Sequence, residues 1–287
     1  VRDAWLQLLQ SLMGESPWKR MPANISDERL LGGLDLPATL STGRPVLQQG
    51  LLSEADGGAL VLAMAERLPP ATAAKLAQVM DSGDVVLARD GLDERRATRF
   101  AVVALDEGAH DDEALLPALR ERLAFDLDLS AIPWQQVRDH PAGLVTAQDV
   151  IAARSRLASV QLPETLVDVL CGTALALGIG SMRASLMVVA AARASAALDG
   201  NLEASDDDAR IAVALVLAPR ATRLPSPPET DAQDDTPEQA PPQQDDTESN
   251  ASTDPSAEQA PLEDQVLDAA KAAIPAGLLS QLLDGGV

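Results

Sequence analysis

The sequence predicts an α/β domain with a parallel sheet, followed by a small all-α domain and a long solvated linker. Residues 59–63 and 100–105 are short continuous apolar runs, which are typical of strands buried on both faces. From Thr146 onward, apolar residues recur at helical spacing. Residues 225–261 contain eight prolines and no apolar residue larger than alanine, so they cannot offset the entropy of ordering. The expected domains are residues 1–140, 141–223, 224–261 and 262–287.

Composition restricts the classes of function. The 287 residues carry a net charge of −22 at pH 7, and ten acidic residues lie in residues 225–261, which have no Lys or Arg. Such a chain lacks the basic surface that nucleic acid or an anionic membrane requires. No signal peptide or membrane-spanning apolar run is found, and the single cysteine, Cys171, fits a reducing compartment. We therefore expect a cytoplasmic protein, of bacterial origin from its Ala- and Arg-rich usage, or a stromal one if it comes from a plastid.

The elements of the first domain follow from local patterns. An amphipathic helix opens the chain at Val1, inside its apolar pattern, so we expect further sequence before it. Residues 30–58 are rich in glycine and turn signals, and we interpret them as an insertion with a short helix at 36–41. After the first apolar run, residues 70–80 predict a helix with proline in its first turn. The Asp90-Gly91 pair then predicts a hairpin.

The remainder of this domain is expected to alternate between strand and helix. The second apolar run, 100–105, predicts a buried strand. Residues 113–123 predict an acidic helix, and the pattern AFDLDL at residues 124–129 predicts a third strand. Strands that alternate with helices indicate an α/β layered domain.

Four helices are predicted in the second domain. Thr146 and Asp149 form a capping-box pattern, and Pro163 is placed to open the next helix. A third helix covers Met182 to Leu198, and Ser205 followed by three aspartates predicts the start of the fourth. Residues 262–287 regain helical spacing after the linker, and we expect a further domain beyond them.

Four segments in this order carry a family resemblance. They are DERLLGGLDLPATLSTGRPVLQQGLLSEADGG (27–58), DGLDERRATRF (90–100), LLPALRERLAFDLDL (115–129) and SMRASLMVVAAARASAALDG (181–200). Residues 1–223 thereby resemble the AAA+ modules, of the helix-2-insert type, in the I and D subunits of magnesium chelatase. The acidic, proline-rich linker after the helical lid favours the D subunit.

The resemblance implies ATP-driven insertion of Mg²⁺ into protoporphyrin IX, in chlorophyll or bacteriochlorophyll biosynthesis for photosynthesis. In that ligase the I subunit is the working ATPase, the D subunit assembles with it in a hexameric-type ring, and the H subunit holds the porphyrin. We therefore expect partners of both kinds, together with self-association of this chain. ATP and Mg²⁺ are expected in the I-type partner, and no cofactor is firmly predicted here. A D subunit also carries an integrin-I domain, which is absent from residues 1–287.

Hydrolysis of ATP needs a phosphate-binding loop and acidic residues that hold Mg²⁺ and activate water. The chain has no G-x-x-x-x-G-K-[ST] sequence. Where the family's Walker B strand is followed by Asp-Glu, it has Ala63 and Met64, with Glu66 two places on. This degenerate Walker B sequence predicts a chain that does not hydrolyse ATP by itself.

Two arginines match functional positions of the family. Arg122 corresponds to the arginine finger, which acts on nucleotide in an adjacent subunit, and Arg183 corresponds to the sensor-2 arginine, for which nucleotide contact and a vestigial role both stay open. By pattern alone, Arg122 is better explained as a helix-surface arginine paired with an acid, and only the family resemblance reverses this preference. Arg120, Arg95 and Arg96 remain alternatives for the finger. No metal ligands are assigned.

Two other functions are kept open. One is an active ATPase whose phosphate loop precedes Val1, although Ala63 and Met64 argue against it. The other is a MoxR-type AAA+ adaptor or ATPase in a different metal-insertion or assembly complex. The LLGGLDL sequence and the acidic linker favour the chelatase over this alternative.

Overall fold

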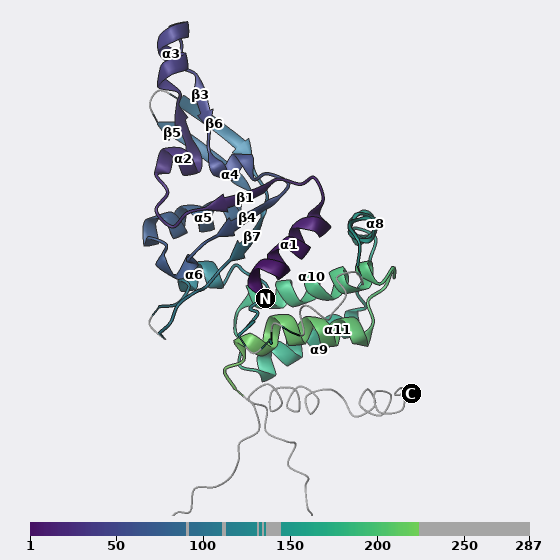
Figure 1. The fold of residues 1–287 in the computed structure, drawn as a ribbon. Helices are drawn as coiled ribbons and strands as arrows, with labels where there is room; N and C mark the ends of the chain where they lie inside the picture. The colour runs from purple at the N-terminus through teal and green to yellow at the C-terminus, as the bar shows by residue number, and fades with distance from the viewer. Residues whose placement is uncertain (90–91, 111–112, 131, 134, 136–144, 224–287) are drawn as a thin grey trace, which may run out of the picture.

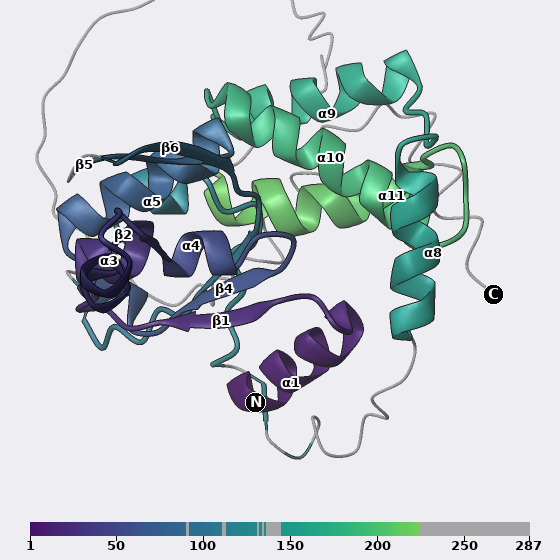
Figure 2. The ribbon, with the colours of Figure 1, turned by 90° about the horizontal axis from the view of Figure 1, so that it is seen from above.

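The computed structural model describes residues 1–89, 92–110, 113–130, 132–133, 135 and 145–223. The predicted linker and the helical segment 262–287 therefore lie outside the described residues. Within the described ranges, no helix is both long and apolar enough to cross a bilayer. Two hydrophobic cores are present, one around a parallel sheet and one among the helices that follow it. Figure 2 shows the sheet on one side and helices α8 to α11 on the other.

The sheet has three parallel strands in the order β1-β4-β7: β1 (Trp18–Met21), β4 (Ala59–Leu62) and β7 (Ala101–Ala104). Every residue of the central strand β4 is buried. Its neighbours pair with it in register, so that Lys19, Leu60 and Val102 lie side by side. Both apolar runs are thus confirmed as strands, but only β4 is buried as predicted: in β7 Ala101 is exposed and the other three residues are partly buried. Strand β1 is an additional strand that the apolar pattern did not predict.

Two antiparallel hairpins project from the same end of the sheet (Figure 1). The first is the predicted insertion, which consists of α2 (Asp27–Leu31), β2 (Gly32–Leu34), α3 (Leu36–Thr42), β3 (Leu47–Gln49) and α4 (Leu51–Glu54). Helix α3 forms its tip. The second hairpin joins β5 (Asp84–Arg89) to β6 (Leu92–Ala97). The insertion with its short helix and the second hairpin are as predicted.

Three further helices precede the lid: α1 (Arg2–Met13), which packs against the lid helix α8, α5 (Pro70–Ser82) and α6 (Pro117–Arg120). Helix α6 is much shorter than the predicted helix 113–123. Pro117 lies in its first turn, and the preceding chain bends because the Leu115 amide donates to the Asp106 carboxylate at 3.0 Å. Helix α6 packs against α5, and Leu119 is buried in the sheet core.

The third strand predicted at 124–129 is wrong. The structure describes these residues, and they form neither strand nor helix. Phe125 and Leu127 are about half exposed, at 50% and 47%, so the alternating pattern does not bury an apolar face. The carbonyl groups of Leu123 and Ala124 accept hydrogen bonds from the Arg220 guanidinium.

The lid consists of α8 (Ala147–Leu157), α9 (Glu164–Ala176), α10 (Met182–Leu198) and α11 (Asp206–Ala212). Helix α11 continues through a π-helical turn, η2 (Val213–Leu217), into a 3₁₀ turn, η3 (Ala218–Arg220). The four predicted helices are confirmed. Helix α10 packs against all the others, and its buried face is mainly alanine, with Val188 at the centre.

Both predicted capping motifs are present, and they differ in burial. The Ser205 hydroxyl and amide donate to Asp208 Oδ2 at 2.7 and 2.9 Å, and Asp208 is 1% exposed. Thr146 and Asp149 make the same contacts at an exposed helix end. Burial acts to raise the pKa of Asp208, but the hydrogen bonds from Ser205 outweigh burial and lower the pKa below its ordinary value.

We expect Asp208→Ala to lower the free energy of unfolding of the lid by about 2 kcal/mol, because a buried amide and hydroxyl lose their acceptor. Asp149→Ala is the matched control at an exposed helix end and should cost much less. The pKa of Asp208 is lower in the folded protein than in the unfolded chain. Its contribution to the free energy of unfolding is therefore full above the pKa of the unfolded chain, and it is lost as the pH falls through the pKa of the folded protein. Thermal unfolding followed by circular dichroism measures both effects. Equal losses in the two variants would contradict this account.

Candidate functional site

The carboxyl end of β4 carries the degenerate Walker B residues. Ala63 is the first residue after the strand, and its amide donates to the Met21 carbonyl on β1 at 3.3 Å. Met64 has a positive φ of 49° and is 40% exposed. A left-handed conformation is uncommon for a residue with a long side chain, so the turn is held by its surroundings. The Ala65 amide, which donates to the Leu105 carbonyl at 2.8 Å, supplies part of that support.

Glu66 is the one acidic side chain in this turn, and it is engaged elsewhere. Its side chain is 1% exposed, and Oε2 accepts a hydrogen bond from the Glu107 amide at 3.0 Å. Oε1 lies 3.4 Å from Nε of Arg67. The carboxylate thus ties the end of β4 to the chain that follows β7. Ala63 and Met64 offer no oxygen ligand from their side chains, so this turn does not fit a hydrated Mg²⁺ ion.

Arg122 follows α6 and is fixed by two partners. Its guanidinium makes a two-pronged ion pair with Asp81, in which Nε donates to Oδ1 at 3.0 Å and Nη2 donates to Oδ2. Nη1 donates to the Ala118 carbonyl at 2.6 Å. The side chain is 18% exposed, so it is more enclosed than an ordinary surface arginine. Asp81 belongs to the last turn of α5, which places it beside α6.

Arg183, in the first turn of α10, reaches the same carboxylate from the lid. Its Nη1 donates to Asp81 Oδ1 at 3.2 Å. The hydrogen bond from Arg122 is the main cause that lowers the pKa of Asp81, with the charge of Arg183 acting in the same direction. Asp81 in turn raises the pKa of Arg122. We call Asp81, Arg122 and Arg183 the two-arginine cluster.

Arg220 holds the backbone next to Arg122. From the end of the lid, its guanidinium donates to the carbonyls of Leu123 and Ala124, the latter at 3.0 Å, and to the Val216 carbonyl at 2.6 Å. Burial lowers the pKa of Arg220 below its ordinary value. The sequence pattern indicates neither Asp81 nor the bonds from Arg220 to Leu123 and Ala124, because these partners lie far away along the chain. No local signal identifies either of them.

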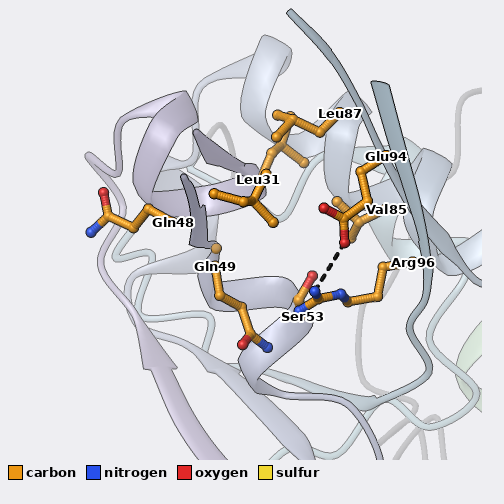
Figure 3. Close-up of a pocket in the computed structure, with 10 residues that line it drawn as sticks. Leu31, Gln48, Gln49, Ser53, Val85, Leu87, Glu94 and Arg96 are labelled. Carbon is orange, nitrogen blue, oxygen red and sulfur yellow. Dashed lines mark hydrogen bonds and ion pairs between the residues drawn. The ribbon is translucent and has the colours of Figure 1, made fainter. Parts of the chain in front are cut away.

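The alternative finger arginines are paired with nearby acids. Arg120 contacts Asp126 at 2.6 Å, and Arg95 contacts Asp84 at 2.5 Å. Arg96 pairs with Glu94 at 2.9 Å in a shallow pocket between the two hairpins (Figure 3). Within the described part of the chain, no three His, Cys, Asp or Glu side chains are grouped as metal ligands.

The parallel sheet, the two hairpins and the four-helix lid together define an AAA+ fold. Residues 168–241 match the model of the AAA lid domain family. A crystal structure of a proposed ATPase from Cytophaga hutchinsonii has a TM-score of 0.56 to this chain and 15% sequence identity, covering 75% of this chain and 72% of that one. The AAA+ fold expected from the sequence is therefore confirmed.

The resemblance to magnesium chelatase subunits is confirmed as well. The chain is 40% identical over 273 residues to the magnesium-chelatase 60 kDa subunit of Cereibacter sphaeroides, which covers 94% of this chain and 44% of that protein. It is also 28% identical over 233 residues to the magnesium-chelatase 38 kDa subunit of Rhodobacter capsulatus, covering 73% of this chain and 65% of that protein. The chain thus spans less than half the length of the 60 kDa relative.

Proposed function

We propose that this chain is the AAA+ module of a magnesium chelatase D subunit, which does not hydrolyse ATP itself and activates an ATP-hydrolysing I subunit. The observation that carries the proposal is the turn after β4. Ala63 and Met64 present no metal ligand there, and the Glu66 carboxylate is bonded to the Glu107 amide. A turn with this chemistry cannot hold Mg²⁺ or activate water for phosphoryl transfer.

Unlike the residues at the Walker B position, the arginines of this chain are still able to act on nucleotide. Arg122 is held in a defined position by Asp81 and by the Ala118 carbonyl. A guanidinium that reaches a nucleotide in an adjacent subunit stabilises the negative charge of the transferring phosphoryl group. In this proposal Arg122 is the catalytic residue, acting in trans, and Arg183 is a second arginine able to contact phosphate.

The whole assembly is expected to insert Mg²⁺ into protoporphyrin IX. An I-type subunit binds ATP with its Mg²⁺, this subunit joins it in a ring, and an H-type subunit presents the porphyrin. The relatives support this division, because the chain is similar to subunits of both the 60 kDa and the 38 kDa classes. We place the reaction in the bacterial cytoplasm and in the pathway to bacteriochlorophyll or chlorophyll.

Reconstitution from separately purified subunits tests the proposal. The full-length protein alone should hydrolyse no ATP above a heat-inactivated sample, because its turn lacks the acidic pair. Added to the 38 kDa-type subunit and the porphyrin-binding subunit, it should be required for formation of magnesium protoporphyrin, followed by absorbance. ATP turnover by the isolated protein, or Mg²⁺ insertion without it, would overturn the proposed role.

A further inference from the structure

Two arginines from different parts of the molecule converge on a single carboxylate. Arg122 follows α6 in the sheet part, Arg183 begins α10 in the lid, and Asp81 ends α5 between them. Both guanidinium groups donate to Oδ1 of Asp81. Among the ion pairs of the described residues, this is the one acidic group that is shared by two arginines.

The geometry of this cluster matches phosphate as well as carboxylate. The planar fork of an arginine binds two oxygens of either group in the same way. Asp81 is 38% exposed and Arg183 is 39% exposed, so an anion from solvent can approach the cluster. Arg122 and Arg183 carry two positive charges and Asp81 carries one negative charge. The negative charge of Glu121 also acts on Arg122.

We propose that Asp81 is a built-in counter-ion that occupies a two-arginine phosphate site and is displaced by the phosphates of nucleotide bound to an adjacent subunit. This inference rests on the proposed function for the identity of that adjacent subunit. Asp81 keeps Arg122 and Arg183 converged while no phosphate is present. It also competes with the phosphate for the two arginines, and so sets the affinity of the site for phosphate. Asp81 is therefore a positioning residue rather than a catalytic one.

The lid is connected to the same site through a second contact. Arg220 binds the carbonyls of the two residues that directly follow Arg122. Movement of the lid would therefore change both the side-chain partner Arg183 and the backbone that carries Arg122. Exchange of the Asp81 carboxylate for a phosphate is thus coupled to the position of the lid.

Binding of inorganic tripolyphosphate to the full-length protein alone tests the site without any ring. We expect Asp81→Asn to tighten binding roughly tenfold at low ionic strength, because the internal competitor loses its charge. Asp84→Asn is the matched control: it changes the net charge equally and frees Arg95, but it frees a single arginine. It should leave the affinity almost unchanged. Isothermal titration calorimetry measures all three proteins after circular dichroism has verified their folding.

The double variant Asp81→Asn with Arg122→Ala should not show the gain in affinity for tripolyphosphate. In Asp81→Asn itself, 0.5 M salt should suppress this gain in affinity. Equal affinities of Asp81→Asn and Asp84→Asn for tripolyphosphate would overturn the proposal.

In the assembled complex, Asp81→Asn should lower the KM for ATP more than it changes kcat, whereas a merely structural role would reduce kcat. If tripolyphosphate binding tightens but Arg122 has no effect on the complex, the phosphate site stands and the proposed function fails.

Discussion

Replacing Arg122 by alanine is expected to lower ATP hydrolysis by the mixed complex on the order of a thousandfold, because the transferring phosphoryl group loses the guanidinium that stabilises its charge. Ring assembly should be unchanged, since Arg122 is 18% exposed and its partners Asp81 and Ala118 belong to the same chain. Mg²⁺ insertion should fall together with ATP hydrolysis. Steady-state ATPase rates measure the loss, and size-exclusion chromatography verifies assembly.

Two variants make this result specific. Arg122→Lys should restore little, because an ammonium lacks the fork that contacts two oxygens. Arg120→Ala removes an arginine two positions away that pairs with Asp126 on the surface, and it should leave turnover near the wild-type level. If a properly assembled complex with Arg122→Ala hydrolysed ATP at the wild-type rate, Arg122 would be an ordinary surface arginine without a catalytic role.

Replacing Gly58 by alanine is expected to destabilise the sheet part by on the order of 3 kcal/mol. Gly58 is buried where β1 and β4 begin, and a Cβ atom there would overlap the carbonyl oxygen of Pro17. That same oxygen accepts the hydrogen bond of the Ala59 amide at 2.8 Å, so the clash cannot be relieved without opening the ladder between the two strands. Urea unfolding measures the loss.

Gly172 provides the opposite control. It lies inside α9, is exposed, and has open space where a Cβ atom would be added. Alanine at this position should stabilise the lid by about 0.5–1 kcal/mol, because glycine loses more backbone entropy in a helix. If both variants changed stability in the same direction, close backbone approach would not be the reason for glycine at position 58.

The elements that were predicted correctly are those whose signals are local. Burial on both faces gives β4 its continuous apolar sequence, and Asp90-Gly91 lies between the paired strands β5 and β6. Strand β1 was missed because Lys19 and Arg20 interrupt its apolar pattern. It lies at the edge of the described sheet, where one side of the strand has no partner strand, and only Met21 is fully buried.

The strand predicted at 124–129 fails for a non-local reason. Its alternating sequence suits a strand, but the Leu123 and Ala124 carbonyls bond to Arg220, 96 or 97 positions further along the chain. The same limit applies to the site. The sequence identified Arg122 and Arg183 through a family resemblance, whereas Asp81 became visible only when folding brought α5, α6 and α10 together. Their roles in nucleotide chemistry remain predictions.

Because the sheet and the lid have separate hydrophobic cores, the position of the aromatic residues decides which spectroscopic signal reports on the unfolding of each part. Trp5 and Trp18 lie on α1 and β1, whereas the lid sequence from 147 to 223 contains no tryptophan, tyrosine or phenylalanine. Trp18 therefore reports on the sheet, Trp5 lies on α1, which packs against α8, and the third tryptophan, Trp134, lies outside the described residues. The lid contributes to far-ultraviolet circular dichroism without any aromatic emission of its own. A tryptophan placed at the exposed Leu175 of α9 would give the lid its own fluorescent reporter.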